Sequence, residues 1–263
     1  SSQDLADFIR RAGFKAVNYG FGGYGPHQYR DAYKAYIIEK DVRHENVLIN
    51  FCFCNDIGNS ISYVNVMRLG GDWKQFLGKT STKNAFPFNF SPPWSVSIAF
   101  NLPFWMLQQI RNQKQRLNSQ DSLEIKLPRK HIEISNWMLE DEPKYFDETT
   151  WEMVFRPIQE ITKLANIAGA RVILGYYPDL AQIYSPFMPK KSPYRLAAEH
   201  NHLNAIMKLS TLAKELGADF IDYTEAMQLA HGKQLATTKN SDYHPNLLGV
   251  KTMAKEVLPF LRN

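Results

Sequence analysis

NVLINFCFC, residues 46 to 54, is the stretch that decides the fold. The run is almost continuously apolar and rich in β-branched and aromatic side chains, which is typical of a strand covered on both faces in a parallel sheet. It stops at the turn-forming residues Asn55 and Asp56. The stretch therefore predicts a buried strand whose carboxyl end presents polar side chains.

The chain on either side alternates between strand and helix patterns. The RVILGYY run at residues 171 to 177 predicts a second buried strand, and shorter strands are expected at residues 15 to 18 and 219 to 223. Helices are expected at residues 5 to 12, from 26 to about 37, from 149 to about 168, from 194 to 216, and from 245 or 246 to 261. This alternation predicts an open α/β sheet with mainly parallel strands, whose sites gather at the turns after strands.

Length and composition favour a single domain over residues 1 to 263. Residues from about 60 to 148 lack the regular alternation and mix aromatic side chains with prolines. Because a structureless loop of that length is uncommon inside a domain, we expect an insertion with helices of its own, packed as a lid or flank.

The charge and hydropathy of the sequence limit the kinds of binding partner that we expect. The net charge is +5, and the basic residues are spread along the chain without the stripe that a nucleic-acid-binding surface needs. The most apolar window, residues 94 to 107, is too short to span a bilayer and is interrupted by Asn101 and Pro103. It suits contact with a membrane surface or a hydrophobic substrate. The sequence begins at Ser1 without the basic and apolar regions of a signal sequence and without an initiator methionine, so a mature or trimmed N-terminus is expected, and cytoplasmic, periplasmic and secreted locations all stay open.

The two cysteines, Cys52 and Cys54, lie inside the apolar run. On an extended strand they would point to the same face with little scope for bonding each other, so buried packing is expected.

Three turns that follow expected strands carry the candidate chemistry. The first contains Asn18, Gly20 and Gly23, the second is Asn55-Asp56, and the third is SDYHPN at residues 241 to 246. Each alone is weak, because Asn, Gly and Asp form turns in any protein.

Together, and in this order, the three turns resemble blocks of the SGNH (GDSL) hydrolase family, esterases and acyl-transferring relatives on a flavodoxin-like three-layer α/β/α sandwich. NYGFGGYG at residues 18 to 25 resembles the second block, which implies that the Gly23 amide is an oxyanion donor. FCND at residues 53 to 56 resembles the third block, which gives the Asn55 side chain the same role. The final turn resembles the fifth block, with His244 as the base and Asp242 as its orienting partner.

The sequence departs from the family in several places. Phe53 stands where the third block often has glycine, and Asp242 precedes His244 by two residues where many members have three. Gly-Asp-Ser, the first block with the nucleophile on the first strand, does not occur in the 263 residues. Because the first block lies upstream of the second, we expect the serine and its strand before Ser1.

Ester cleavage by a serine needs a base, an oriented imidazole and preformed donors for the developing oxyanion. The sequence thus predicts a serine ester hydrolase that forms an acyl-serine intermediate and needs no metal or organic cofactor. An O-acyltransferase on the same fold and a non-catalytic binding relative stay as alternatives. The substrate, a carbohydrate, lipid or small ester, is left open, with Asn18, Tyr24 and Pro178 as candidate contacts.

Overall fold

The computed structural model describes residues 4–20, 24–53, 55–68, 70, 122–127, 130–135, 147–233, 237–239 and 242–261. Its centre is a parallel sheet of three strands in the order β1 (Asn46–Cys52), β4 (Arg171–Tyr177) and β5 (Asp219–Asp222). β1 and β4 pair along their whole length, from Asn46 opposite Arg171 to Cys52 opposite Tyr177. The protein is therefore of the mixed α/β class, as the alternation of sequence patterns predicts.

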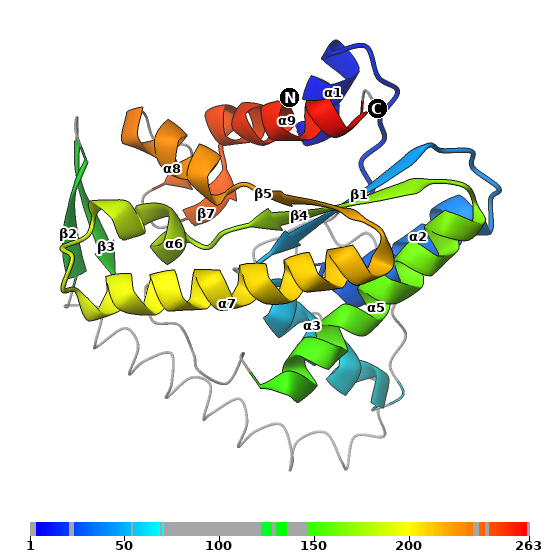
Figure 1. The fold of residues 1–263 in the computed structure, drawn as a ribbon, viewed down its shortest axis with the longest axis horizontal. Helices are drawn as coiled ribbons and strands as arrows, with labels where there is room; N and C mark the ends of the chain where they lie inside the picture. Colours follow the sequence, from blue (N-terminus) through cyan, green and yellow to red (C-terminus); the bar gives the residue numbers. More distant parts are fainter. Residues whose placement is uncertain are drawn as a thin grey trace, which may run out of the picture.

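Helices lie on both faces of this sheet (Figure 1). One face packs against α2 (Pro26–Tyr33), α3 (Asp56–Arg68), α5 (Glu148–Ile167) and α7 (Pro193–Leu216). The other face packs against α1 (Leu5–Arg11), α8 (Thr224–Lys233) and α9 (Leu247–Leu261).

Side chains of β4 alternate between these two faces, as the strand geometry requires. Val172, Leu174 and Tyr176 belong to the cluster with α5 and α7, whereas Ile173 and Tyr177 belong to the cluster with α9. Trp151 of α5 is fully buried against Phe51 of β1. Burial of both faces explains why the strand sequences are continuous apolar runs.

The ends of the helices follow local sequence rules. Asp4 and Asp7 form a reciprocal capping box at the start of α1, and the Asp147 carboxylate accepts from the Thr150 amide at the start of α5. α7 ends at Gly217, whose φ of 65° is the left-handed conformation that glycine adopts without strain.

The remaining described elements are short. A π-helical turn, η1 (Lys34–Ile38), extends α2, and α6 (Leu180–Tyr184) with the 3₁₀ turn η6 (Ser185–Phe187) follows β4. Two antiparallel hairpins are formed by β2 (Ser122–Leu127) with β3 (Lys130–Ser135), and by β6 (Thr237–Lys239) with β7 (Asp242–Pro245).

Most predicted elements are confirmed, and the structure corrects the others. β1 ends at Cys52, two residues earlier than predicted, because Phe53 already lies in a turn. The predicted strand at residues 15 to 18 is wrong, since it has no ladder partner among the described residues. The sequence patterns missed α8 and the β6–β7 hairpin.

Within the predicted insertion, the structure describes most of α3 and the β2–β3 hairpin. Ile125 of β2 is fully buried in a cluster with Tyr184 and Ala198. The aromatic stretch from residue 71 to 121 lies outside the described residues. In the part of the chain that is described, no helix has the length and apolar character needed to cross a membrane.

The expectation that the cysteines do not bond is contradicted. Cys52 is disulfide-bonded, and Cys54 is the only other cysteine in the sequence. The expectation assumed a strand through residue 54, along which side chains two apart are held at the limit of disulfide reach. The turn at Phe53 removes that assumption.

Candidate active site

The candidate site lies at the edge of the sheet where the parallel strands end. In Figure 1 the arrows of β1, β4 and β5 point toward the side of the molecule that holds α6, α8 and β7. Asn55 lies three residues after the end of β1, and His244 lies in β7. The carboxyl ends of parallel strands are where α/β sheets usually bind ligands.

Asn55 lies immediately before α3. Its carbonyl accepts the Asn59 amide at 2.8 Å, and its own amide donates to the Cys52 carbonyl at 3.3 Å. Asparagine is a favoured residue at a helix start, so its position has a structural explanation as well as the predicted catalytic one. The backbone around Asn55 is fixed by these bonds, and its side chain is half-buried.

Asp56 is fully buried beside it. Its Oδ2 accepts from the Cys52 amide at 3.0 Å, and the Tyr29 hydroxyl lies 3.0 Å from Oδ1 and 3.1 Å from Oδ2. Burial raises the pKa of Asp56 well above its usual value, while the hydrogen bonds from Cys52 and Tyr29 act in the opposite direction. Through these contacts Asp56 holds the turn after β1.

The glycine-rich turn is fixed at both ends. Asn18 accepts the Gly20 amide at 2.8 Å through Oδ1 and donates to Asp4 through Nδ2 at 3.0 Å. At the other end, the Gly25 amide donates to Oε1 of Gln28 at 3.1 Å. Gly23, the predicted oxyanion donor, lies outside the described residues, so its role stays a prediction.

This glycine turn packs directly on the start of α3. The Tyr24 carbonyl accepts from Nδ2 of Asn59 at 3.1 Å and lies 3.2 Å from the Tyr29 hydroxyl. A Cβ on Gly25 would lie 2.9 Å from the Asp56 carbonyl oxygen, closer than real side chains approach. The structure therefore brings together two of the three predicted turns, and glycine at position 25 permits the contact.

His244 is exposed and lies three residues before α9. Oδ1 of Asn246 caps that helix by accepting the amides of Leu248 and Gly249 at 2.9 and 3.1 Å. The expectation of an imidazole presented near a helix start therefore agrees with the backbone. The side chain of Asp242 is not among those described, so its orienting role stays a prediction.

The candidate substrate contacts differ in accessibility. Asn18 is exposed, but Oδ1 of its side chain already accepts from Gly20, and Nδ2 donates to Asp4 at the start of α1. Tyr24 is 3% exposed, and burial raises the pKa of its hydroxyl. Pro178 is buried at the end of β4. The contact of all three with a substrate stays a prediction.

Further polar side chains at this edge were not singled out from the sequence. The Tyr176 hydroxyl donates to Oε1 of Gln182 at 2.5 Å, and Asp179 and Gln182 form a capping box for α6. The Asp-x-x-Gln pattern after the strand was the available signal. The pair explains how the loop after β4 is held.

A histidine that the sequence placed on α7 also faces this edge. Nε2 of His202 lies 3.5 Å from the Asp222 carboxylate, and Nδ1 lies 3.4 Å from the Thr224 hydroxyl. Burial lowers the pKa of His202, and the nearby Asp222 raises it in part. Within the described residues, no group of three or more His, Cys, Asp or Glu side chains is arranged to hold a metal ion.

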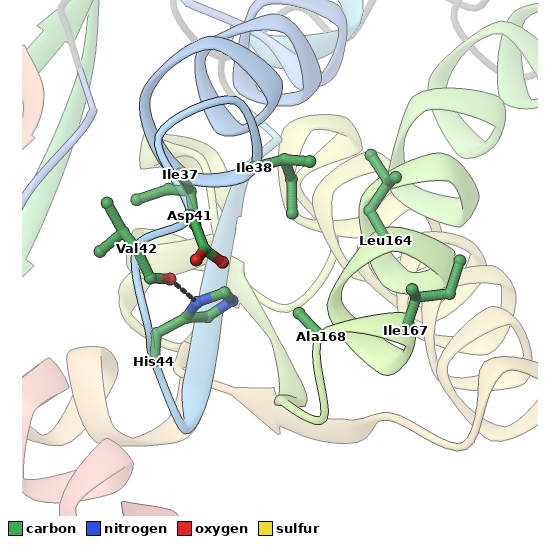
Figure 2. A pocket seen from close by; sticks show the side chains of 8 residues that line it. All are labelled: Ile37, Ile38, Asp41, Val42, His44, Leu164, Ile167 and Ala168. Atoms are coloured by element: carbon green, nitrogen blue, oxygen red, sulfur yellow. Dashed lines mark hydrogen bonds between the residues drawn. The ribbon is translucent and has the colours of Figure 1, made fainter.

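A shallow apolar pocket of about 180 Å³ lies at the opposite edge of the sheet (Figure 2). It is lined by η1, the C-terminal turn of α5, and Asp41 and His44 from the loop before β1. Nδ1 of His44 donates to the Val42 carbonyl at 2.8 Å, which leaves Nε2 to accept from the Tyr33 hydroxyl at 2.7 Å. These bonds hold the His44 ring in place, and the pocket lies at the end of the sheet opposite the Asn55 turn.

The fold and these contacts define an α/β protein in which two of the predicted polar turns meet at the start of α3. Comparison with protein-family models, curated proteins and solved structures finds no match to this chain.

Proposed function

We propose that the protein is a serine ester hydrolase of the SGNH type, with His244 as the base and Asn55 and Gly23 as oxyanion donors. The observation that carries the proposal is the contact between the glycine turn and the start of α3, through Tyr24, Gly25 and Asn59. The resemblance requires these two turns to face a common reacting atom, and they are separated by about 30 residues of sequence.

The arrangement of the elements supports the finer fold proposal. Helices on both faces of a three-stranded parallel sheet fit a flavodoxin-like three-layer α/β/α sandwich. In the described residues β1 pairs on one side only, with β4, although most of its residues are apolar like those of a central strand. A further strand on the free side of β1 would complete the sheet.

That free edge is where we place the missing nucleophile. In the proposal, a strand encoded upstream of residue 1 pairs with β1 and carries the serine at its carboxyl end, beside Asn55. His244 removes the serine proton as the oxygen attacks the ester carbonyl, and the Asn55 amide donates to the resulting oxyanion. His244 then returns the proton to the departing alcohol, and water resolves the acyl-serine by the same route.

Kinetics of two variants test the assignment in the protein expressed from its full reading frame. Asn55→Ala should lower kcat for a small acyl ester by roughly 100 to 1,000-fold, because one preorganised oxyanion donor is lost. Asn166→Ala is the matched control, since Asn166 is exposed near the end of α5 at the opposite edge. A loss below about tenfold for Asn55→Ala would count against its role.

Adding an acyl acceptor to the assay distinguishes a hydrolase from a transferase. An excess of a sugar or small alcohol should change the product ratio little if water resolves the acyl-serine. Transfer that dominates in dilute acceptor would instead assign the same site to an O-acyltransferase.

A further inference from the structure

Tyr29 connects the two turns of the proposed oxyanion site. It lies on α2, and its hydroxyl is 3.2 Å from the Tyr24 carbonyl of the glycine turn. The same hydroxyl is 3.0 and 3.1 Å from the two oxygens of Asp56, at the start of α3. A single hydroxyl group therefore lies between the two segments, and it comes from a residue 27 positions before Asp56 in the sequence.

Counting hydrogens shows how these contacts can all be satisfied. A tyrosine hydroxyl has one hydrogen to donate and can also accept. If Asp56 were ionised, both neighbours of the hydroxyl would be acceptors, and one of the two contacts would lack a proton. If Asp56 carries a proton, Asp56 donates to Tyr29, and Tyr29 donates to the Tyr24 carbonyl.

The surroundings of Asp56 fit the neutral form. The carboxyl group is fully buried, and the described contacts to it come from the Cys52 amide and the Tyr29 hydroxyl, neither of which is a cation. Burial without a cationic partner raises the pKa of a carboxyl group, as it does for Asp56.

We propose that Asp56, Tyr29 and the Tyr24 carbonyl form a continuous hydrogen-bonded chain, with Asp56 neutral, that positions Asn55 and the glycine turn for oxyanion binding. Tyr29 and Asp56 are positioning residues in this arrangement, because they act through the turns and touch no reacting atom. Asn59 reinforces the same link by donating to the Tyr24 carbonyl. The inference rests on the function proposed above.

Four variants test the chain by steady-state kinetics on a small acyl ester. Tyr29→Phe should lower kcat by about tenfold or more while KM changes by less than about threefold, because misplaced donors cost turnover more than binding. Asp56→Asn should stay within about threefold of wild type, since an amide can donate to Tyr29 and accept from Cys52.

The third variant is the double substitution Tyr29→Phe with Asn55→Ala. If Tyr29 acts by positioning Asn55, its loss should cost less than about threefold once Asn55 is absent. The fourth, Tyr33→Phe, is the control: it removes a hydroxyl from the same helix, but that hydroxyl bonds His44 at the other edge of the sheet. It should leave kcat unchanged.

Amide hydrogen exchange tests the hydrogen-bonded chain of Asp56, Tyr29 and Tyr24 without relying on enzyme activity. Tyr29→Phe should speed exchange of the Gly25 and Cys52 amides by about tenfold or more, whereas Tyr33→Phe and Asp56→Asn should not. If Tyr29→Phe fails to fold, Asn59→Ala replaces it and should speed exchange at Gly25. If the wild-type protein has no esterase activity, the proposed function is wrong. Hydrogen exchange then tests the hydrogen-bonded chain by itself.

Two results would overturn the inference. One is that the exchange rates of the Gly25 and Cys52 amides do not change in folded Tyr29→Phe. If Asn59→Ala is used in its place, the corresponding result is an unchanged exchange rate of the Gly25 amide. The other is an Asp56→Asn variant that loses as much turnover or protection as Tyr29→Phe, which would show that a charged carboxylate is needed.

Discussion

At the scale of single residues, Gly175 shows how closely the sheet and its polar side chains are fitted. The Tyr223 hydroxyl donates to Oδ1 of Asn50 at 2.9 Å, so a side chain that follows β5 reaches over β4 to β1. A Cβ on Gly175 would lie 2.5 Å from the Asn50 oxygen and 2.7 Å from the Tyr223 hydroxyl. Glycine at this position keeps the space that the hydrogen bond occupies.

Gly175→Ala should therefore destabilise the protein by about 1 to 3 kcal/mol, because either the bond or the strand spacing must give way. Denaturant unfolding measures the change. Gly58→Ala is the matched control: a Cβ there meets nothing within 4 Å, and the residue lies in α3. The control should gain up to about 1 kcal/mol from helix propensity. Equal effects of the two substitutions would contradict the packing described for Gly175.

Sequence patterns predicted some residues of the candidate site and missed others. Asn55 and His244 were found because each follows a strand in a short local motif. Tyr29 falls in the helix expected from residue 26, but the sequence does not single it out, because its partners Tyr24 and Asp56 are known only after α2 and α3 pack. Spacing along one helix cannot reveal a hydroxyl shared between two segments.

At the scale of elements, α2, α3 and α5 are joined by a polar cluster. Nε of Arg30 donates to Asp31 at 2.8 Å, and the Tyr63 hydroxyl donates to the other Asp31 oxygen. Arg30 also reaches Glu160 of α5 at 3.5 Å. The Asp31 side chain is 10% exposed and that of Arg30 is 16% exposed, so water screens this pair little.

Arg30→Met should cost about 3 to 5 kcal/mol, because it leaves the Asp31 carboxylate buried without its cation. The double variant Arg30→Met with Asp31→Leu should cost clearly less, since no isolated charge remains. Urea unfolding measures the free energy of unfolding of the two variants. A double variant that is less stable than the single one would show that the cluster stabilises the helices by more than mutual neutralisation.

The strands show which elements the sequence can predict. β4 was predicted with its observed bounds because it is apolar on both faces and ends at Pro178. The end of β1 was misplaced because apolar residues continue through the turn at Phe53. The β6–β7 hairpin was missed because its three- and four-residue strands are too short for periodicity to emerge.

At the scale of the whole molecule, two buried histidines link stability to pH. Burial lowers the pKa of His27, on α2, and of His231, on α8, to about 4 in each case. His27 stacks on Tyr63 at 4.9 Å, and the His231 ring meets the edge of Tyr184 at 4.7 Å. Both rings therefore stay neutral in the fold at pH values where an unfolded histidine takes up a proton.

Stability should fall as the pH drops from about 6.5 toward 4, by about 2 kcal/mol per histidine between pH 7 and pH 5. Guanidinium unfolding of wild type, His27→Phe and His231→Phe at both pH values measures each share as the difference from wild type. Asp56 acts in the opposite direction, since a raised carboxyl pKa favours the fold as pH falls, and it cancels in these differences. Variants that lose as much stability on acidification as wild type would contradict the assignment.

The free side of β1 is the whole-molecule feature on which the proposed function depends. Sequence predicted the loss of a leading strand from the absent Gly-Asp-Ser block, and the described sheet has β1 at its edge. The central claim is that a strand pairs with this free side and carries a serine beside Asn55.

A fluorophosphonate probe on the protein from its full reading frame tests that claim most directly. The account predicts covalent labelling of one serine upstream of residue 1, located by mass spectrometry of peptides, and loss of labelling in folded His244→Ala. No labelling of the folded wild-type protein, or labelling that His244→Ala leaves unchanged, would contradict it.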